Sequence, residues 1–334
     1  MSIQQNTIDG KQILVVGGTG DIGRALSYVL SRNNEVDVLA RGTDPAVVEE
    51  LSGFCRRIWQ RDLSHDSPLD GIDTPYDYVF HMAVHWGFRR DLAFGEFDYF
   101  QRVNTLSGAR LIYHFADSGA SFVFGSTGGV YQPCAPGQRR NESDVAIGGD
   151  NPYEISKIQL EGMTLGLSDM YDVPVAVLRY FWPIFPWGGG GPARGVFSRV
   201  LEGEPVQRCE NPEGRRPMNL GYVADLAYAT IEAAASAKPA RLEENATGRI
   251  YNVSGQEAAS LEEIAVEFAD QMGLEAKFQE GPAEGEHLTY VADVTKMSEQ
   301  LWKPRIGVEE CIRRVVRGEK ERCRRMEEWM FEVE

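Results

Sequence analysis

Short apolar runs alternate with amphipathic segments along the first half of the chain. The runs are rich in Val, Ile, Leu and Phe and have the length of buried strands; they lie at 12–18, where the run ends in two glycines, and at 36–40, 76–84, 121–127 and 173–181. The segments between them repeat apolar residues with helical spacing, at 21–30, 45–54, 95–117 and 152–171. Strands that alternate with helices predict an α/β fold with a doubly wound parallel sheet.

The pattern changes after Phe181. Residues 182–195 are rich in Gly, Pro and aromatic side chains, which predicts a loop. One further strand, at 249–255, is expected to return to the sheet. We therefore expect a first domain at 1–181, completed by this strand, and a smaller C-terminal substrate-binding lobe built mainly from 182–334.

Two further helices are predicted in the second half. Ser260, with Glu263 three residues later, has the pattern of a helix start whose first backbone N–H groups are capped by side chains. An amphipathic and highly charged helix is expected from about Val308.

Composition narrows the class of protein. The 334 residues are 43% hydrophobic and 25% charged, as in a soluble globular protein. A net charge of -16 disfavours nucleic acid and anionic membranes as partners. Five scattered cysteines without a CxxC pair are typical of a reducing compartment, and the start of the chain is too polar for a signal peptide. No apolar run reaches the roughly 18 residues of a membrane helix. We expect a cytoplasmic protein without a metal site.

Three glycines, Gly17, Gly20 and Gly23, lie between the first strand and the first helix. In this context such glycines permit a tight turn, the approach of a pyrophosphate and close helix–strand packing. The helix N-terminus, at Asp21 and Ile22, supplies N–H groups to the phosphates. The loop therefore predicts a bound dinucleotide.

The end of the second strand and the end of a further strand just before Asp62 suggest which dinucleotide is bound. An acidic residue at the tip of the second strand would bind the ribose of NAD, but here Arg41 follows Ala40. Arginine can pair with a 2′-phosphate, so the sequence favours NADP over NAD, although Asp21 adds an opposing negative charge nearby. Asp62 either receives the adenine amino group or caps the following turn. Its neighbour Leu63, and Ala83 near the end of the strand at 76–84, are expected at the same site; Ala83 lies in "HMAV".

A candidate acid/base group follows. Ser126 and Thr127 end the strand predicted at 121–127, and strand ends of such a sheet face the ligand crevice. Tyr153 and Lys157 are four residues apart, so in a helix their side chains share one face. A free phenol has a pKa of about 10, and a nearby ammonium lowers it. The glycine loop, the Ser–Thr strand end and the Tyr–Lys pair follow one another in this order. Together they predict that Tyr153, with its pKa lowered by Lys157, acts as an acid/base next to a nicotinamide.

These motifs together resemble the extended short-chain dehydrogenases/reductases, the NAD-dependent epimerase/dehydratase family. The resemblance extends over about residues 12–315 and includes "GGTGDIG", "DYVFHMAV", "VNTLSGARLI", "GSTGGVY", "YEISK", "RRPMNLGYVADLAYA" and "YNVSG". It implies a Rossmann fold and hydride transfer between nicotinamide and a substrate carbon.

The resemblance also implies a role for each matching residue. Tyr153 is then the acid/base at a substrate oxygen, and Thr127 hydrogen-bonds the same oxygen. Lys157 holds the nicotinamide ribose and lowers the tyrosine pKa, Ser126 lines the nicotinamide side, and Asn104 supports the site.

Two departures from the family narrow the reaction. Dehydrating and decarboxylating members carry a carboxylate after the strand-end Thr, where this chain has Gly128 and Gly129. Without a second acid/base, simple transfer at one carbinol is favoured. Trp182 stands where relatives have an asparagine that contacts a nucleotide sugar's phosphates, which weakens the case for such a substrate.

Substrate contacts stay open at the sequence level. Arg194 and Arg216 either pair with a diphosphate or are solvated. His85 is either a second proton donor or a lining side chain. Trp86 and Trp187 either wall the substrate site or pack in the core, and Trp182 belongs to the same candidate set.

Three functions remain. The first is an NAD(P)-dependent 4-epimerase or 4-ketoreductase of a nucleotide sugar. The second is an NADP-dependent ketoreductase of a non-sugar carbonyl, and the third a catalytically silent dinucleotide sensor. Relatives dimerise through two helices per subunit, which implies a homodimer through about 95–117 and 152–170.

Overall fold

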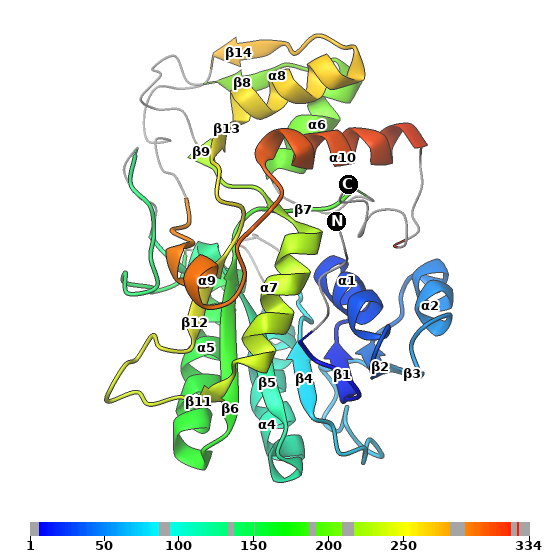
Figure 1. The fold of residues 1–334 in the computed structure, drawn as a ribbon, viewed down its shortest axis with the longest axis vertical. Coiled ribbons are helices and arrows are strands. Elements are labelled where there is room, and N and C mark those ends of the chain that lie inside the picture. The colour runs from blue at the N-terminus through cyan, green and yellow to red at the C-terminus, as the bar shows by residue number, and fades with distance from the viewer. Residues whose placement is uncertain are drawn as a thin grey trace. The chain divides into compact units, whose positions relative to one another are not determined.

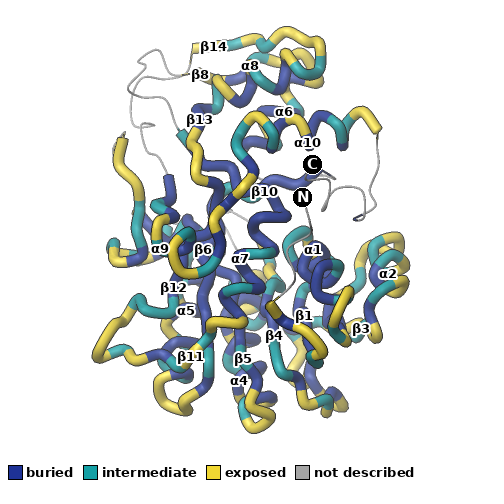
Figure 2. The backbone as a smooth tube through the Cα atoms, viewed as in Figure 1, coloured by how far each residue is buried: buried dark blue, intermediate teal, exposed yellow. Residues whose placement is uncertain are grey.

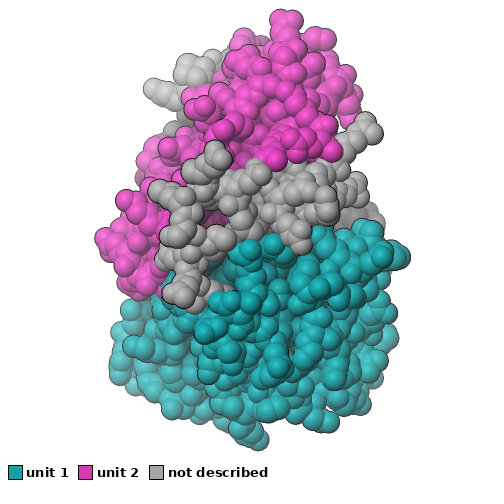
Figure 3. All heavy atoms as spheres, turned by 45° about the vertical axis from the view of Figure 1, so that its right-hand side comes forward, with its two compact units in different colours: residues 1–132, 145–179, 227–251 teal, residues 133–144, 180–226, 252–334 magenta. Residues whose placement is uncertain are grey.

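A computed structural model describes residues 7–86, 94–132, 137–149, 151–186, 192–208, 217–280, 291–321 and 326 (Figure 1). The chain divides into two compact units (Figure 3). The first consists of Met1–Gln132, Val145–Arg179 and Ala227–Tyr251, and the second of Pro133–Asp144, Tyr180–Leu226 and Asn252–Glu334. Arg216 and Trp187, two candidates of the sequence analysis, lie outside the described residues.

A central sheet dominates the first unit. Its strands in the described residues are β1 (Gln12–Val16), β2 (Glu35–Ala40), β3 (Arg57–Gln60), β4 (Tyr78–His81), β5 (Ser121–Thr127), β6 (Pro174–Tyr180), β11 (Lys238–Pro239) and β12 (Ile250–Val253). Their spatial order is β11-β6-β5-β4-β1-β2-β3, with β12 also paired to β6. The pairs of β1 with β2 and β4, of β2 with β3 and of β4 with β5 are parallel. The predicted α/β fold with a doubly wound parallel sheet is confirmed.

Helices cover both faces of this sheet. They are α1 (Asp21–Leu30), α2 (Pro45–Ser52), α3 (Phe94–Phe100), the π-helix η1 (Gln101–Leu106), α4 (Ser107–Phe115), the 3-10 turns η2 (Ala116–Ser118) and η3 (Gly128–Val130), α5 (Pro152–Tyr171) and α7 (Val223–Ala235). Figure 1 shows α7 in front of the sheet and α4 and α5 behind it. The core lies between these layers, where Leu14, Phe122 and Leu160 are fully buried (Figure 2). The burial of such apolar side chains is the main favourable term in folding.

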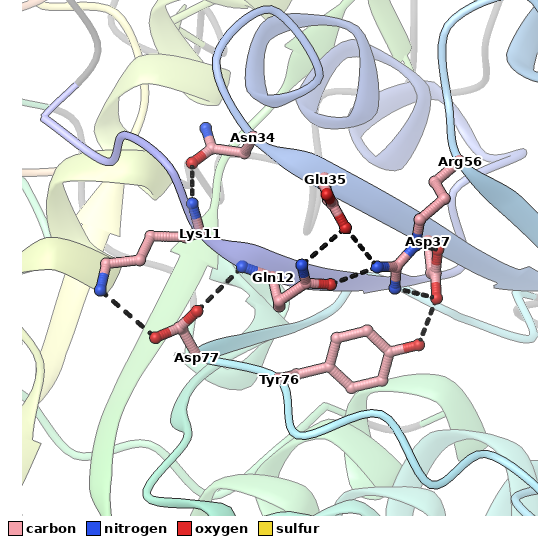
Figure 4. Close-up of polar contacts among 8 residues, drawn as sticks. All are labelled: Lys11, Gln12, Asn34, Glu35, Asp37, Arg56, Tyr76 and Asp77. Atoms are coloured by element: carbon pink, nitrogen blue, oxygen red, sulfur yellow. Dashed lines mark hydrogen bonds and ion pairs between the residues drawn. The ribbon is translucent and has the colours of Figure 1, made fainter.

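A polar network joins the amino-terminal ends of the first strands (Figure 4). Asp37 of β2 is completely buried and accepts two 2.7 Å hydrogen bonds from Arg56. The Tyr76 hydroxyl donates to the same carboxylate at 2.7 Å, and Gln12 and Glu35 also bind the Arg56 guanidinium. The buried charge of Asp37 is thus fully paired, as stability requires. Because this network lies at the edge opposite the glycine loop, we assign it to the fold and not to a ligand site.

The second unit has its own helices and short strands. These are β7 (Pro183–Ile184), α6 (Pro192–Glu202), β8 (Val206–Arg208), β9 (Pro217–Met218), β10 (Gly221–Tyr222), β13 (Ala259–Ser260), α8 (Leu261–Met272), β14 (Phe278–Glu280), α9 (Thr295–Gln300) and α10 (Val308–Glu321). Helix α8 packs against α6 and α10, and the rings of Phe197 and Phe268 lie 4.5 Å apart.

Two sequence predictions for this unit have definite outcomes. The predicted capping of α8 is confirmed, because Ser260 and Glu263 bind each other's backbone N–H groups. The predicted loop 182–195 is wrong at its end, because α6 begins at Pro192. Proline fits the first turn of a helix, where its missing N–H has no intrahelical partner. Among the described residues, no helix is both long enough and apolar enough to cross a membrane.

Candidate functional site

The glycine loop lies where the strand order reverses, between β1 and β4. Ligands of doubly wound folds bind at such a switch point, outside the carboxyl ends of the strands. Gly17 has a φ of +85°, and a Cβ atom there would lie within 3.0 Å of the Ala83 backbone. Its N–H donates to the Leu39 carbonyl at 2.7 Å. A side chain at Gly17 would therefore both strain the turn and separate the loop from the segment that follows β4.

The other glycines bring helix α1 close to the loop. A Cβ at Gly23 would lie within 3.0 Å of the Gly17 carbonyl, and the Gly20 N–H donates to that carbonyl at 3.0 Å. Gly20 is the N-cap, so Asp21 and Ile22 form the first turn of α1. Gly18 also has no room for a side chain, because Val38 lies against it. The spacing of the other three glycines did not indicate that Gly18 is required. The loop has the cradle geometry that a pyrophosphate requires.

Arg41, Asp62 and Tyr99 form a polar cluster beyond the ends of β2 and β3. The Arg41 guanidinium donates to the Tyr99 hydroxyl at 3.0 Å, and this hydroxyl donates to Asp62 at 3.2 Å. Asp62 also accepts a 2.8 Å hydrogen bond from the Ser64 N–H, so it caps the turn that includes Leu63. Burial disfavours its charged form, but the hydrogen bonds of Ser64 and Tyr99 and the charge of Arg41 keep the pKa of Asp62 below its ordinary value.

His85 belongs to this same cluster. Its ring lies 4.7 Å from the Tyr99 ring and 4.5 Å from the Phe100 ring, measured between centroids. Burial, together with the nearby Arg41 charge, lowers the pKa of His85. The structure thus groups His85 with Arg41 and not with the strand-end Ser–Thr pair. Trp86, the next residue, is exposed.

Asn104 lies in the π-helix η1, which the sequence predicted only as a helix. Its amide donates to the His85 carbonyl at 2.8 Å and to the Ser156 hydroxyl at 3.0 Å, and its oxygen accepts from the His85 N–H at 2.6 Å. The side chain is completely buried, so these protein partners account for its position. A π-helix contains one more residue per turn than an α-helix, and such turns frequently occur at functional sites. In η1 the Asn104 side chain reaches Ser156 of α5.

The strand-end hydroxyls and the Tyr–Lys pair come together at the carboxyl end of β5. Tyr153, at the start of α5, is half-buried and hydrogen-bonded to the Thr127 side chain. Lys157 lies one turn later, is 3% exposed, and donates to the Gly125 carbonyl of β5 at 2.7 Å. Ser126 is also buried. These four side chains therefore lie together at the carboxyl end of β5 in the first unit.

The protein groups alone do not lower the Tyr153 pKa as the sequence suggested. Burial raises the pKa of Tyr153 to about 12, the Thr127 hydrogen bond opposes this rise, and the Glu154 charge adds to it. Burial likewise lowers the pKa of Lys157 to about 8, against the attraction of Glu161. The expectation was wrong because it counted the Lys157 charge and not the desolvation of the phenol.

The structure also contains a carboxylate that the sequence analysis missed. The Glu154 carboxylate occupies the space next to Gly129 and Gly149. A Cβ atom at either glycine would come within 3.0 Å of this carboxylate. Gly129 lies in η3, two residues after Thr127, and is one of the two glycines that stand where a second acid/base would be expected. The sequence contained a signal for this carboxylate, because Glu154 is the acidic residue directly after Tyr153.

Two predicted substrate residues lie in the second unit. Trp182 is half-buried and has a φ of +43°, a conformation that bulky residues rarely adopt. Arg194 is paired with Glu319 of α10, which gives its guanidinium a partner within the unit.

Sequence comparisons identify the family of the chain. Residues 13–254 match the model of the NAD dependent epimerase/dehydratase family. The UDP-N-acetyl-alpha-D-glucosaminuronate decarboxylase of Bacillus cytotoxicus is 26% identical, over 92% of this chain and 97% of the relative. The UDP-glucuronate 4-epimerase of Thermodesulfobacterium geofontis is 25% identical, over 90% of both.

A solved structure of a member of this family is similar to the chain over most of its length. The Thermus thermophilus UDP-glucose 4-epimerase in complex with NAD is 25% identical, with a TM-score of 0.75 over 92% of this chain and 99% of the other. The fold and the glycine loop define a Rossmann-type enzyme. The chain belongs to the NAD-dependent epimerase/dehydratase family, the extended short-chain dehydrogenases/reductases, as its motifs predicted.

Proposed function

We propose that this protein is an NAD-dependent nucleotide-sugar epimerase that oxidises and re-reduces one carbinol carbon, the 4-position of the sugar. The observation that carries the proposal is the grouping of Ser126, Thr127, Tyr153 and Lys157 at the strand ends of a sheet whose glycine loop fits a pyrophosphate. The names of the relatives, epimerases and a decarboxylase of UDP sugars, support the substrate class.

The residues of this chain divide the work of a proton-coupled hydride transfer. Tyr153 takes the proton of the substrate hydroxyl during oxidation and returns it to the same oxygen during re-reduction, so that inversion depends on which face of the carbon is re-reduced. Thr127 hydrogen-bonds the same oxygen, and the Lys157 ammonium holds the cofactor ribose. A nicotinamide held at this site would supply the hydride chemistry and a positive charge. Tyr153 would need such a charge to form a phenolate, because burial raises its pKa.

We propose NAD as the cofactor. Structures of relatives in complex with NAD support it, and they give no support to the NADP preference that rested on Arg41. The Arg41 guanidinium hydrogen-bonds Tyr99, a contact that does not require a 2′-phosphate. Calorimetric titration with NAD⁺ and NADP⁺ tests the choice, and Arg41→Ala should leave the NAD⁺ affinity nearly unchanged. Tighter binding of NADP⁺ that is lost in this variant would restore the NADP assignment.

The proposed function is tested on freshly purified protein. Nucleotide released by denaturation is identified by chromatography, and UDP-glucose, UDP-N-acetylglucosamine and UDP-glucuronic acid are each incubated with the enzyme. The proposal expects retained NAD and conversion of one sugar to its 4-epimer. An empty protein that consumes NADPH with a non-sugar ketone would instead identify a ketoreductase, and the absence of any turnover with bound cofactor would favour a sensor.

Replacement of the acid/base gives a matched test. Tyr153→Phe should lower the turnover number about 10²- to 10⁴-fold, the usual contribution of general acid/base catalysis, and leave the cofactor bound. The control is Tyr113→Phe, an exposed tyrosine on α4, which should keep full activity. Equal activity of the Tyr153→Phe variant and the wild type would remove Tyr153 from the mechanism.

A decarboxylase is the second candidate, and one observation favours it. The Glu154 carboxylate lies against Gly129, one of the two glycines after Thr127, and could replace the carboxylate that the family resemblance leads one to expect there in a decarboxylase. With UDP-glucuronic acid in the same assay, release of CO₂ and formation of a pentose product would identify this activity.

A further inference from the structure

Glu161 and Arg179 form a buried ion pair next to Ser126 and Lys157. Glu161 follows Lys157 by one turn of α5 and is 2% exposed, and Arg179 of β6 is 3% exposed. Arg179 binds the Glu161 carboxylate with both ends of its guanidinium fork, at 2.9 Å and 2.6 Å. Neither residue belongs to the motifs that identified the site.

The pair is anchored on one side and contacts the site on the other. Arg179 donates a third hydrogen bond to the Tyr131 hydroxyl at 2.6 Å, and its guanidinium lies 4.6 Å from the centre of that ring. On the site side, the Ser126 hydroxyl donates to Glu161 at 2.5 Å. A buried carboxylate with this many partners has one preferred position, since any movement would break charge-assisted hydrogen bonds in a medium of low polarity.

Two consequences follow for the site. The Ser126 hydroxyl has one proton and gives it to Glu161, so towards the cofactor its oxygen can only accept a hydrogen bond. The negative charge of Glu161 also lies one helical turn from the Lys157 ammonium and attracts it.

We propose that Glu161, held by Arg179, is a positioning residue of the active site that orients the Ser126 hydroxyl as an acceptor and keeps Lys157 in its ammonium form. The inference rests on the proposed function only in that Ser126 and Lys157 serve the cofactor.

The surroundings of Lys157 make this charge assignment specific. Glu161 and Tyr153 face it from α5, the Gly125 carbonyl from β5, and His81 from β4. Burial and the Lys157 charge lower the pKa of His81 to about 3, so this histidine is neutral over the range in which Lys157 titrates. Tyr153, with a pKa of about 12, is neutral over the same range. Glu161 is therefore the negatively charged group among these neighbours.

The first test measures Lys157 itself. The full chain is labelled with ¹³C at the lysine ε-carbon, the Lys157 signal is assigned by its loss in Lys157→Met, and its pKa is followed by NMR. Glu161→Gln should lower this pKa by about one unit or more, the usual effect of one nearby charge. The apolar pair Glu161→Met with Arg179→Met should do the same. It avoids an unpaired buried arginine, which is the main threat to folding in the single variant.

A buried variant on the same helix is the control. Ser168 donates to the Val173 carbonyl at 2.6 Å and accepts from the Ala240 N–H at 2.8 Å, far along α5 from the site. Ser168→Ala should reduce stability and leave the Lys157 pKa unchanged. If the pKa is the same in the wild type and in both Glu161 variants, the proposal is overturned.

The second test separates orientation from charge. Glu161→Asp keeps the charge and withdraws the carboxylate from Ser126, so it should preserve the Lys157 pKa. Both Glu161→Asp and Ser126→Ala should weaken NAD⁺ binding about 3- to 10-fold, the loss expected for one hydrogen bond. Their combination should be no weaker than either one alone, because both break the same contact. Additive losses would contradict the orienting role.

Both readouts are independent of turnover. If no UDP sugar is converted but the Lys157 pKa and the NAD⁺ affinity change as described, the proposed function fails and the role of Glu161 stands. If a UDP sugar is converted but neither the Lys157 pKa nor the NAD⁺ affinity changes, the proposed function stands and the role of Glu161 fails.

Discussion

Lys157 shows how a charge at a candidate active site can lower stability. Its ammonium is almost completely buried, and burial lowers its pKa to about 8 from the ordinary 10.5. Each unit of this shift corresponds to about 1.4 kcal/mol of preference for the neutral form. The folded protein below pH 8 therefore retains a charge that its surroundings disfavour, which is typical of functional sites.

Replacement of Lys157 by methionine should stabilise the fold. At pH 7 we expect Lys157→Met to raise the free energy of unfolding by about 1–3 kcal/mol, because it removes the desolvation cost. Between pH 8 and 10.5 the unfolded chain binds more protons at this residue than the folded one, so the wild type gains stability as the pH rises. Urea unfolding at pH 7 and 9.5 should thus show a smaller difference at the higher pH; a difference that grows with pH would refute the argument.

Trp182 presents a different strain at the residue scale. Its φ of +43° places a bulky side chain in the left-handed region, which costs a non-glycine residue about 1–2 kcal/mol. Trp182→Ala and Trp182→Gly remove the same indole, so they differ only in the backbone. We expect the glycine variant to be more stable by about 1 kcal/mol, the reverse of the usual order, in urea titrations. If alanine is the more stable, the backbone at this position is not strained.

At the scale of elements, the η3 turn and helix α5 are fitted to each other. Glu154 of α5 fills the space beside Gly129 and Gly149, so this contact requires glycine on the turn and a carboxylate on the helix. The match connects the end of β5 with the residue next to Tyr153 and thereby limits where the phenol can lie.

Alanine at Gly129 should therefore disturb the site. Gly129→Ala should displace Glu154 and lower the free energy of unfolding by about 1–3 kcal/mol, as overpacking usually does. Glu154→Ala in the same chain should restore most of it. The matched control is Gly162→Ala, where a Cβ meets nothing within 4 Å and alanine should stabilise α5 by about 0.5–1 kcal/mol. Thermal unfolding measures all three, and an unaffected Gly129→Ala variant would show that the contact is loose.

At the scale of the whole molecule, α4 and α5 carry exposed apolar side chains. Tyr113 is 63% exposed and Met170 70% exposed, and the Tyr113 ring contacts that of Tyr171. These residues belong to, or directly follow, the two segments that the sequence analysis expected in a dimer. The predicted homodimer would bury this surface.

A charge on that surface should separate the subunits. We predict a dimer by sedimentation equilibrium for the wild type and a folded monomer for the combined Tyr113→Glu and Met170→Glu variant, because a buried unpaired charge is costly. Val266→Glu, on an exposed position of α8, is the control and should remain dimeric. A wild-type monomer would rule out the predicted assembly.

Local patterns in the sequence determined the elements and the candidate catalytic groups. Apolar periodicity is a property of a few neighbouring residues, so β5 was predicted with its observed bounds and α5 was found together with Tyr153 and Lys157. The glycine loop was equally readable, because a positive φ at Gly17 and the close packing of Gly23 require glycine wherever this motif occurs.

Only the tertiary structure decided the environment of these groups. The partners of Arg41 and Ser126 are Tyr99 and Glu161, which are 58 and 35 residues away in the chain. Burial reversed the expected shift of the Tyr153 pKa, since desolvation depends on every segment packed around the phenol. Residue types and spacing specify which chemical groups are present, whereas their charge states and orientations arise from contacts between segments that the sequence does not place side by side.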